Sequence, residues 1–129
     1  PQHRLTVVRA PSGLTIIDDT FNANPASSVV ALEALQEVPV SGRRVVVTPG
    51  LVELGTRQHD ENRLFGRRVH DAHCELVVVA STNAAALREG FSGSVVRCAT
   101  REEAVGWVRE NLGGEDAVLY LNDLPDHYP

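Results

Sequence analysis

Two adjacent carboxylates, Asp18 and Asp19, follow the short apolar run from Leu14 to Ile17, and the amides Asn22 and Asn24 come soon after them. The apolar run is rich in β-branched residues, which is typical of a buried strand. Ligands of open α/β sheets bind at the carboxyl ends of strands, so these side chains could hold the hydroxyl or phosphate groups of a ligand. The same residue types also cap helices and stabilise turns, so the stretch alone leaves both roles open.

Two further polar loops are expected to lie beside the first one. Residues 49–55 follow the apolar run 43–48, and residues 122–126 follow the apolar run 116–121. The carboxyl ends of parallel strands meet at one edge of a sheet, so the three loops 18–24, 49–55 and 122–126 should form a single polar rim. These loops contain carboxylates and amides but no lysine or arginine. Such a rim suits hydroxyl groups, ammonium groups or a metal-bound nucleotide better than a bare phosphate.

The elements that position this rim alternate along the chain after an opening hairpin. Helix starts are indicated by Asn24 before Pro25, and by a capping box formed by Thr100 and Glu103. The alternation predicts an α/β domain with a mainly parallel, doubly wound sheet. The predicted strands are residues 4–9, 14–17, 43–48, 75–80, 94–98 and 116–121, and the predicted helices are residues 25–38, 57–73, 81–87 and 100–112.

Composition narrows the function classes. The 129 residues are 43% hydrophobic and 22% charged, which is typical of one globular domain. The net charge of −5 argues against a nucleic-acid partner and against an anionic membrane surface. All twelve basic residues are arginine, so this chain holds no P-loop lysine and no Schiff-base lysine. The chain opens with Pro1 rather than methionine, so residues 1–129 are expected to be one domain excised from a longer chain.

Other residues that could carry chemistry are expected to be structural. Cys74 and Cys98 predict free, mostly buried thiols of a cytosolic protein. His70 and His73 lack a third ligand at metal-site spacing, so they are expected to be surface residues rather than a metal site. Ser27 and Ser28 are explained by helix capping, and both Trp107 and Tyr120 by packing in the core.

A family resemblance adds to these observations. Residues 18–27, DDTFNANPAS, resemble the D-D-[ST]-[YF]-N-A-N-P-x-S signature that opens the C-terminal domain of Mur ligases, the ATP-dependent amide-forming enzymes of peptidoglycan synthesis. The resemblance is closest to the branch that adds D-alanyl-D-alanine. It extends over nearly the whole chain, because HRL at residues 3–5, ELG at residues 53–55 and the long helix that follows are also similar.

The resemblance implies a fold and a division of labour. It implies a Rossmann-like sheet of about six strands that closes over a central ATPase domain of the same chain. That central domain would hold most of the ATP and Mg²⁺, and this domain would carry neither catalytic residues nor metal ligands. The nucleotide would meet Asp19, which would hydrogen-bond the ribose, and the loop lined by Asn22 and Asn24. The small-molecule or peptide substrate would meet Gly50, Glu53, Asn122 and Asp123.

The chain departs from the family pattern at two places. Gly50 stands where the D-alanyl-D-alanine branch has the aspartate of G-D-M-x-E-L-G, and residues 121–126 replace a K-G-[SA]-R-like string. The expected function is nevertheless that of a closing domain in a ligase that adds an amino acid or dipeptide to a UDP-muramoyl peptide or a related acceptor. A non-catalytic nucleotide- or partner-binding module is the alternative. A phosphoacceptor receiver domain is disfavoured, because that fold needs a lysine near its phosphoryl group.

Overall fold

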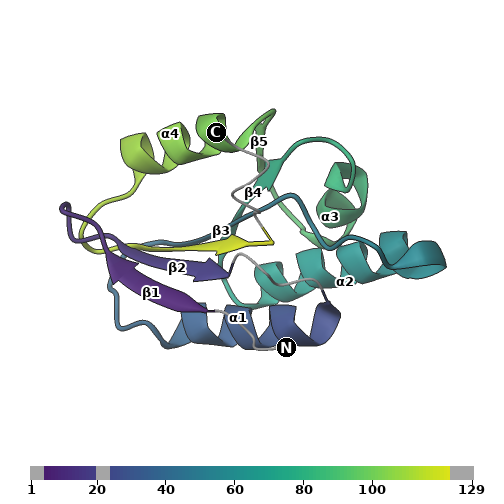
Figure 1. Ribbon diagram of the computed structural model, residues 1–129, viewed down its shortest axis with the longest axis horizontal. Helices are drawn as coiled ribbons and strands as arrows, with labels where there is room; N and C mark the ends of the chain where they lie inside the picture. The colour runs from purple at the N-terminus through teal and green to yellow at the C-terminus, as the bar shows by residue number, and fades with distance from the viewer. Residues whose placement is uncertain (1–4, 20–23, 123–129) are drawn as a thin grey trace.

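The structure, a computed structural model, describes residues 5–19 and 24–122. Within these residues a six-stranded sheet is covered by helices on both faces (Figure 1). The elements in chain order are β1 (Thr6–Arg9), β2 (Thr15–Asp19), α1 (Pro25–Glu37), β3 (Arg44–Thr48), the 3₁₀ helix η1 (Gly55–Arg57), α2 (Gln58–Asp71), β4 (Glu75–Val79), α3 (Ala84–Gly90), β5 (Val96–Cys98), α4 (Arg101–Asn111) and β6 (Ala117–Leu121).

The strand order is β1-β2-β6-β3-β4-β5. β1 and β2 form the predicted antiparallel hairpin, and all other neighbours are parallel, so the fold class expected from the sequence is confirmed. The last strand of the chain, β6, lies between β2 and β3: Asp19 pairs with Leu121, and Val47 pairs with Tyr120. The carboxyl ends of β2, β6 and β3 are therefore neighbours at one edge.

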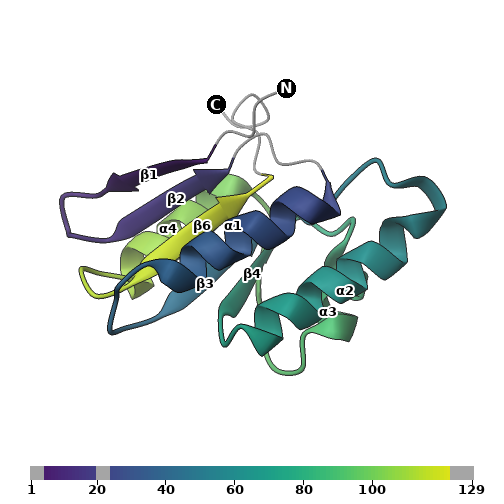
Figure 2. The same ribbon diagram turned by 90° about the horizontal axis from the view of Figure 1, so that it is seen from below.

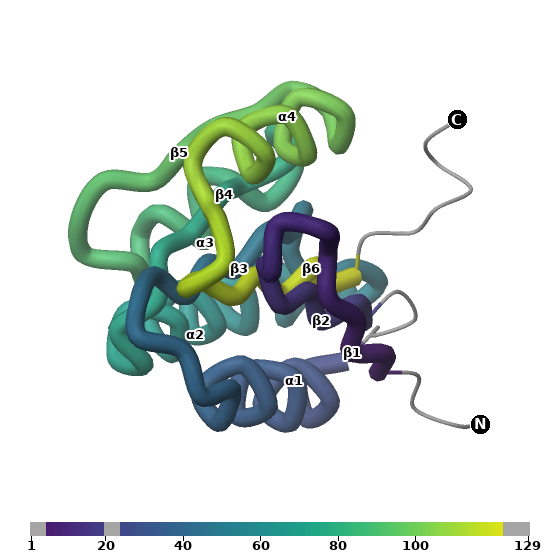
Figure 3. Tube along the Cα trace, turned by 90° about the vertical axis from the view of Figure 1, so that its left-hand side faces the viewer, coloured from purple at the N-terminus to yellow at the C-terminus, as the bar shows by residue number. Residues whose placement is uncertain are grey.

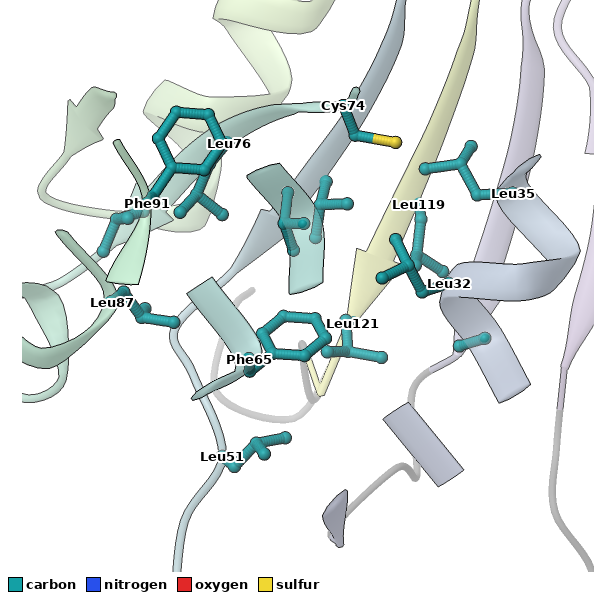
Figure 4. Packing of buried hydrophobic residues seen from close by; sticks show 14 of the residues in the cluster. Leu32, Leu35, Leu51, Phe65, Cys74, Leu76, Leu87, Phe91, Leu119 and Leu121 are labelled. Carbon is teal, nitrogen blue, oxygen red and sulfur yellow. The ribbon is translucent and has the colours of Figure 1, made fainter. Parts of the chain in front are cut away.

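Helices cover the two faces unequally. Helix α4 lies on one face, and α1 and α2 lie side by side on the other (Figures 2 and 3). Successive residues of a strand point to opposite faces, which is why β3 can be buried on both sides. Val46 belongs to the core beneath α1 and α2, whereas Val45 and Val47 belong to the core beneath α4. Figure 4 shows the larger core, in which side chains from α1, α2 and α3 meet those of the sheet.

Two expectations about individual residues need correction. Asp18 and Asp19 were expected in a loop, but they are the last two residues of β2, because parallel pairing with β6 continues to Leu121. Trp107 was expected in the core, but it is only half-buried: its ring packs at the edge of the α4 core, with the guanidinium carbon of Arg43 5.6 Å from the ring centroid. Tyr120 is buried in that core, as expected.

Both predicted helix caps are confirmed. The Asn24 side chain accepts a hydrogen bond of 2.8 Å from the backbone N–H of Ser27, and the Thr100 hydroxyl accepts one of 3.2 Å from that of Glu103. The Glu103 carboxylate accepts from the backbone N–H of Ala99, one residue before the position expected for a capping box. Ser28 donates its hydroxyl proton to the carbonyl of Pro25, so it too has a structural role.

Close packing of α2 against α3 depends on two glycines. A methyl group built on Gly66 of α2 would overlap the carbonyl of Leu87, and one on Gly90 of α3 would overlap the carbonyl of Arg63. In both cases the obstacle is helical backbone, which cannot rotate away as a flexible side chain can. The two helices therefore approach more closely than side chains at these positions would permit.

The two cysteines are free and buried, as expected. Burial raises the pKa of the Cys74 thiol from 9.0 to about 11. In the unfolded chain this thiol ionises from about pH 9, whereas in the folded protein it stays protonated until about pH 11. The preference of the folded protein for the protonated Cys74 thiol therefore contributes fully to the free energy of unfolding below pH 9. We expect this contribution to be lost as the pH rises from 9 to 11.

This loss can be measured by urea unfolding between pH 8 and 11. We expect the free energy of unfolding to fall more steeply in the wild type than in Cys74→Ala, which keeps Cys98 and every other titrating group. Parallel curves for the two proteins would show that Cys74 does not contribute to the pH dependence.

Candidate site at the carboxyl edge of the sheet

The structure brings together three of the residues predicted for the site. Asp19 ends β2, Asn122 directly follows β6, and Gly50 lies in the loop after β3. The backbone N–H of Asn122 donates to the carbonyl of Asp19 at 3.0 Å, and its side-chain Nδ2 donates to the carbonyl of Gly50 at 2.8 Å. The described parts of the three predicted loops thus meet at one edge, with Asn122 between Asp19 and Gly50, while residues 20–23 and 123–126 of the predicted rim lie outside the described residues.

The remaining predicted residues divide into three groups. Asn24 lies at the start of α1, where its side-chain oxygen accepts from the Ser27 backbone and hydroxyl. Glu53 is exposed at the far end of the loop after β3. Asn22 and Asp123 lie outside the described residues, so their predicted roles stay predictions.

The two carboxylates at the end of β2 differ in environment. The Asp19 side chain is fully buried, on the same face of the sheet as Ile17 and therefore on the side of α1 and α2. Asp18 is half-buried and alternates to the face covered by α4. A buried carboxylate is retained where polar groups satisfy it, so Asp19 is the better placed of the two for a specific interaction.

The loop after β3 is held by three side-chain amides, two from α2 and one from the start of α3. Asn62 of α2 makes a reciprocal pair with Leu51: its Oδ1 accepts from the Leu51 N–H at 2.8 Å, and its Nδ2 donates to the Leu51 carbonyl at 2.9 Å. Asn83 donates to the carbonyl of Pro49 at 3.0 Å, and Gln58 donates to Asn83 at 2.8 Å. Asn62 and Asn83 are buried and Gln58 is half-buried, and their amides satisfy backbone groups of a loop that has no ladder bonds.

Sequence reasoning did not identify Gln58, Asn62 or Asn83 as part of the site. One signal was available for Asn62: it shares a helical face with Phe65, Gly66 and Val69, which makes it a polar residue at a core position. Asn83 was read as the start of a helix, but it makes no side-chain cap bond and holds the β3 loop instead. A polar residue at a helix position that faces the core, such as Asn62, was therefore the sequence feature that could have indicated this role.

Gly50 is required by both its backbone and its surroundings. Its φ is +97°, a conformation that L-residues rarely adopt. A Cβ atom at this position would lie 2.6 Å from Oδ1 of Asn62 and 2.7 Å from Cβ of Asn83. The amide network therefore occupies the space that a side chain at position 50 would need.

Backbone strain gathers at the same edge. Among the described residues, the non-glycine residues with positive φ are Glu53 at 62°, His73 at 61°, Ala80 at 63° and Asn122 at 56°. Three of them follow the carboxyl ends of strands: Glu53 after β3, Ala80 after β4 and Asn122 after β6. Such conformations persist where the surrounding structure enforces them, and they are common at functional sites.

The groups at this edge can accept hydrogen bonds from a ligand and orient it. Carboxylate and carbonyl oxygens can accept from hydroxyl or ammonium groups, and the three loops contain no cationic side chain for phosphates. In the described part of the chain, no group of three or more His, Cys, Asp or Glu residues is placed to hold a metal ion. None of three surface cavities, the largest of about 340 Å³, is lined by Asp19, Gly50, Glu53 or Asn122.

Comparison with known proteins decides the family. The sequence profile of the family described as "Mur ligase, glutamate ligase domain" matches residues 3–121. The chain belongs to this family. The resemblance seen in residues 18–27 therefore extends through every strand of this Mur ligase domain.

Curated relatives and solved structures agree with this assignment. The Mur ligase domain is 33% identical to the UDP-N-acetylmuramoyl-tripeptide–D-alanyl-D-alanine ligase of Mycobacterium leprae, over 92% of this chain and 27% of that protein. It is 24% identical to the Bacillus subtilis enzyme of the same name, over 91% of this chain and 27% of that protein. The chain thus spans about a quarter of the length of these relatives.

Two solved structures share the fold. MurF from Acinetobacter baumannii superposes with a TM-score of 0.75 at 26% identity, covering 93% of this chain and 27% of that one. The MurF ligase from Thermotoga maritima, solved in complex with ADP, gives a TM-score of 0.75 at 23% identity, covering 91% of this chain and 26% of that one. Separately, no described helix of this Mur ligase domain is long and apolar enough to cross a membrane.

Proposed function

We propose that this Mur ligase domain closes over the central ATPase domain of the same polypeptide and helps an ATP-dependent ligase form an amide bond in the cytoplasm. The observation that carries the proposal is the meeting of Asp19, the Gly50 loop and Asn122 at one edge, joined by hydrogen bonds. The end of β2 with the residues that follow it would face the nucleotide (the nucleotide-facing arm), and the loop after β3 would face the substrate (the substrate-facing arm), on either side of the end of β6. One domain could then orient both reactants, a contribution of proximity.

The donor set fits part of a nucleotide. Ribose hydroxyl groups are donors, and the buried carboxylate of Asp19 is an acceptor at the carboxyl end of β2, next to the end of β6. The loops offer no cation for the triphosphate, so the central domain would hold the phosphates and Mg²⁺. ATP would supply the phosphoryl group that activates the acceptor carboxylate. This chain would orient the ribose through Asp19, with Asn22 and Asn24 in the same loop.

The substrate arm fits an amine. Glu53 presents an exposed carboxylate at the end of a loop that Gln58, Asn62 and Asn83 hold in place. Gly50, Asn122 and Asp123 would complete this arm. We propose D-alanyl-D-alanine as the amine and UDP-N-acetylmuramoyl-tripeptide as the acceptor, because the relatives named above are described as ligases of this pair.

The decisive experiment is an ATP-dependent ligation assay on the full-length parent protein. UDP-N-acetylmuramoyl-tripeptide is offered with D-alanyl-D-alanine and with a panel of other amines, and phosphate release and the product are both measured. Turnover with the dipeptide supports the proposal. Turnover with another amine would leave the ligase proposal standing and show that the proposed amine is wrong. Phosphate release without a ligated product would reject amide formation.

We expect residues 1–129 by themselves to hydrolyse no ATP, because the rim loops lack any cation to stabilise a transferring phosphoryl group. Phosphate release from the purified domain, compared with a sample in which the chain has been heat-denatured, checks this. Turnover above that background would place the phosphoryl chemistry on this chain.

We expect Asp19→Ala in the full-length protein to raise the KM for ATP roughly 5- to 150-fold, which corresponds to losing about 1–3 kcal/mol of hydrogen bonding to the ribose. The backbone carbonyl of Asp19 remains available to Asn122, so the two arms stay joined. Asp18→Ala is the matched control, because the alternation of β2 places that side chain on the α4 face. An unchanged KM in Asp19→Ala would show that the ribose assignment is wrong.

A further inference from the structure

Asn122 occupies the one strand end that borders both arms of the site. It directly follows β6, which lies between β2 and β3 in the sheet. Its φ of 56° turns the backbone out of the strand, a conformation that asparagine tolerates better than most residues. This turn lets the main chain and the side chain of one residue point to different neighbours.

The two hydrogen bonds of Asn122 go to opposite sides. Its backbone N–H binds the carbonyl of Asp19 on β2, and its Nδ2 binds the carbonyl of Gly50 in the loop after β3. The residue is only 6% exposed. One donor of the side-chain amide is therefore engaged inside the protein.

The other residues that hold the loop after β3 act from a different direction. Gln58, Asn62 and Asn83 belong to α2 and to the start of α3, and their side-chain hydrogen bonds among the described residues reach the loop and one another. Asn122 instead joins the loop to the strand that ends in Asp19. Beyond the ladder that pairs β2, β6 and β3, Asn122 therefore adds a direct link between the end of β2 and this loop.

We propose that Asn122 is a positioning residue that couples the nucleotide-facing arm to the substrate-facing arm, a role that rests on the proposed ligase function. It fixes the distance between the Asp19 carboxylate and the Glu53 loop through its hydrogen bonds to the carbonyls of Asp19 and Gly50. Removing its side chain should therefore disturb the binding of both reactants, whereas removing another residue that holds the loop should disturb only the amine.

The test uses three variants of the full-length protein. Asn122→Gly keeps the left-handed backbone and the bond to Asp19 but loses the bond to Gly50. Asn83→Ala loosens the same loop from the side of α3, and Asn111→Gly is the same chemical change at an exposed residue at the end of α4. We expect Asn122→Gly to raise the KM for ATP and the KM for the amine about fivefold each, Asn83→Ala to raise only that for the amine, and Asn111→Gly to raise neither.

Two results would overturn the coupling. One is an unchanged KM for ATP in Asn122→Gly; the other is an equal rise of both KM values in Asn83→Ala, which would indicate general loosening of the domain. The outcome can be separated from failure of the ligase proposal by hydrogen exchange on the 129-residue chain. In Asn122→Gly the amides at the end of β2 and in residues 50–54 should exchange faster together; faster exchange confined to the loop would reject coupling even if no ligation is found.

Discussion

Replacing Gly50 by aspartate, the residue found at this place in the D-alanyl-D-alanine branch, is expected to destabilise the domain by roughly 3–5 kcal/mol. Two costs add. The backbone φ of +97° is unfavourable for any L-residue, and the new side chain would meet Asn62 and Asn83 at less than 3 Å. Because both amides are bonded to the loop itself, neither can move aside without releasing Leu51 or Pro49.

Urea unfolding of the 129-residue chain measures this effect, and Gly55→Ala is its matched control. Gly55 also has a positive φ, of +59°, but a Cβ atom there meets nothing within 4 Å. It should therefore report backbone strain alone, at a cost of about 1–2 kcal/mol. If Gly50→Asp cost no more than Gly55→Ala, the amide network would not be the reason for glycine at position 50.

This result bears on substrate choice. In this chain a neutral, packed amide network occupies the position of a family carboxylate, so Glu53 is the carboxylate left on the described part of the loop after β3. Restoring aspartate at position 50 should therefore not improve ligation of an amine, because the network would have to break to admit it. An increase in kcat/KM for D-alanyl-D-alanine in Gly50→Asp would contradict this interpretation.

Replacing Gly66 by alanine is expected to destabilise the domain by roughly 2–4 kcal/mol. The added methyl group would overlap the carbonyl of Leu87, so α2 and α3 would have to separate along their contact. Phe65 and Leu87 belong to the core beneath these helices, and their packing would loosen as well. Because α2 also carries Gln58 and Asn62, faster hydrogen exchange should appear in the loop after β3.

Gly106→Ala is the control for this substitution. Gly106 lies within α4, where a Cβ atom meets nothing within 4 Å, so the change should stabilise the chain by about 0.5–1 kcal/mol through helix propensity. The two substitutions are chemically identical and should have opposite signs in thermal or urea unfolding. Equal effects would mean that the contact between α2 and α3 adapts readily.

The features of this protein that depend on local pattern could be predicted before the fold was known. Strand and helix order follows from hydrophobic periodicity, and the caps at Asn24 and Thr100 follow from residues a few positions apart. The family was visible in residues 18–27 because that signature is contiguous. The polar rim could also be expected, since any parallel sheet gathers the carboxyl ends of its strands at one edge.

Which residues meet at that edge depends instead on the order of the strands in the folded sheet. β6 lies between β2 and β3 although it is last in the chain, and pairing over such separations leaves no local trace in the sequence. This placement extends β2 through Asp19 and puts Asn122 between Asp19 and Gly50. The burial of Asn62 and Asn83 against the β3 loop likewise depends on how α2 and α3 pack. The backbone groups that these amides bind are distant in the sequence, so the hydrogen bonds cannot be predicted before the helices are placed.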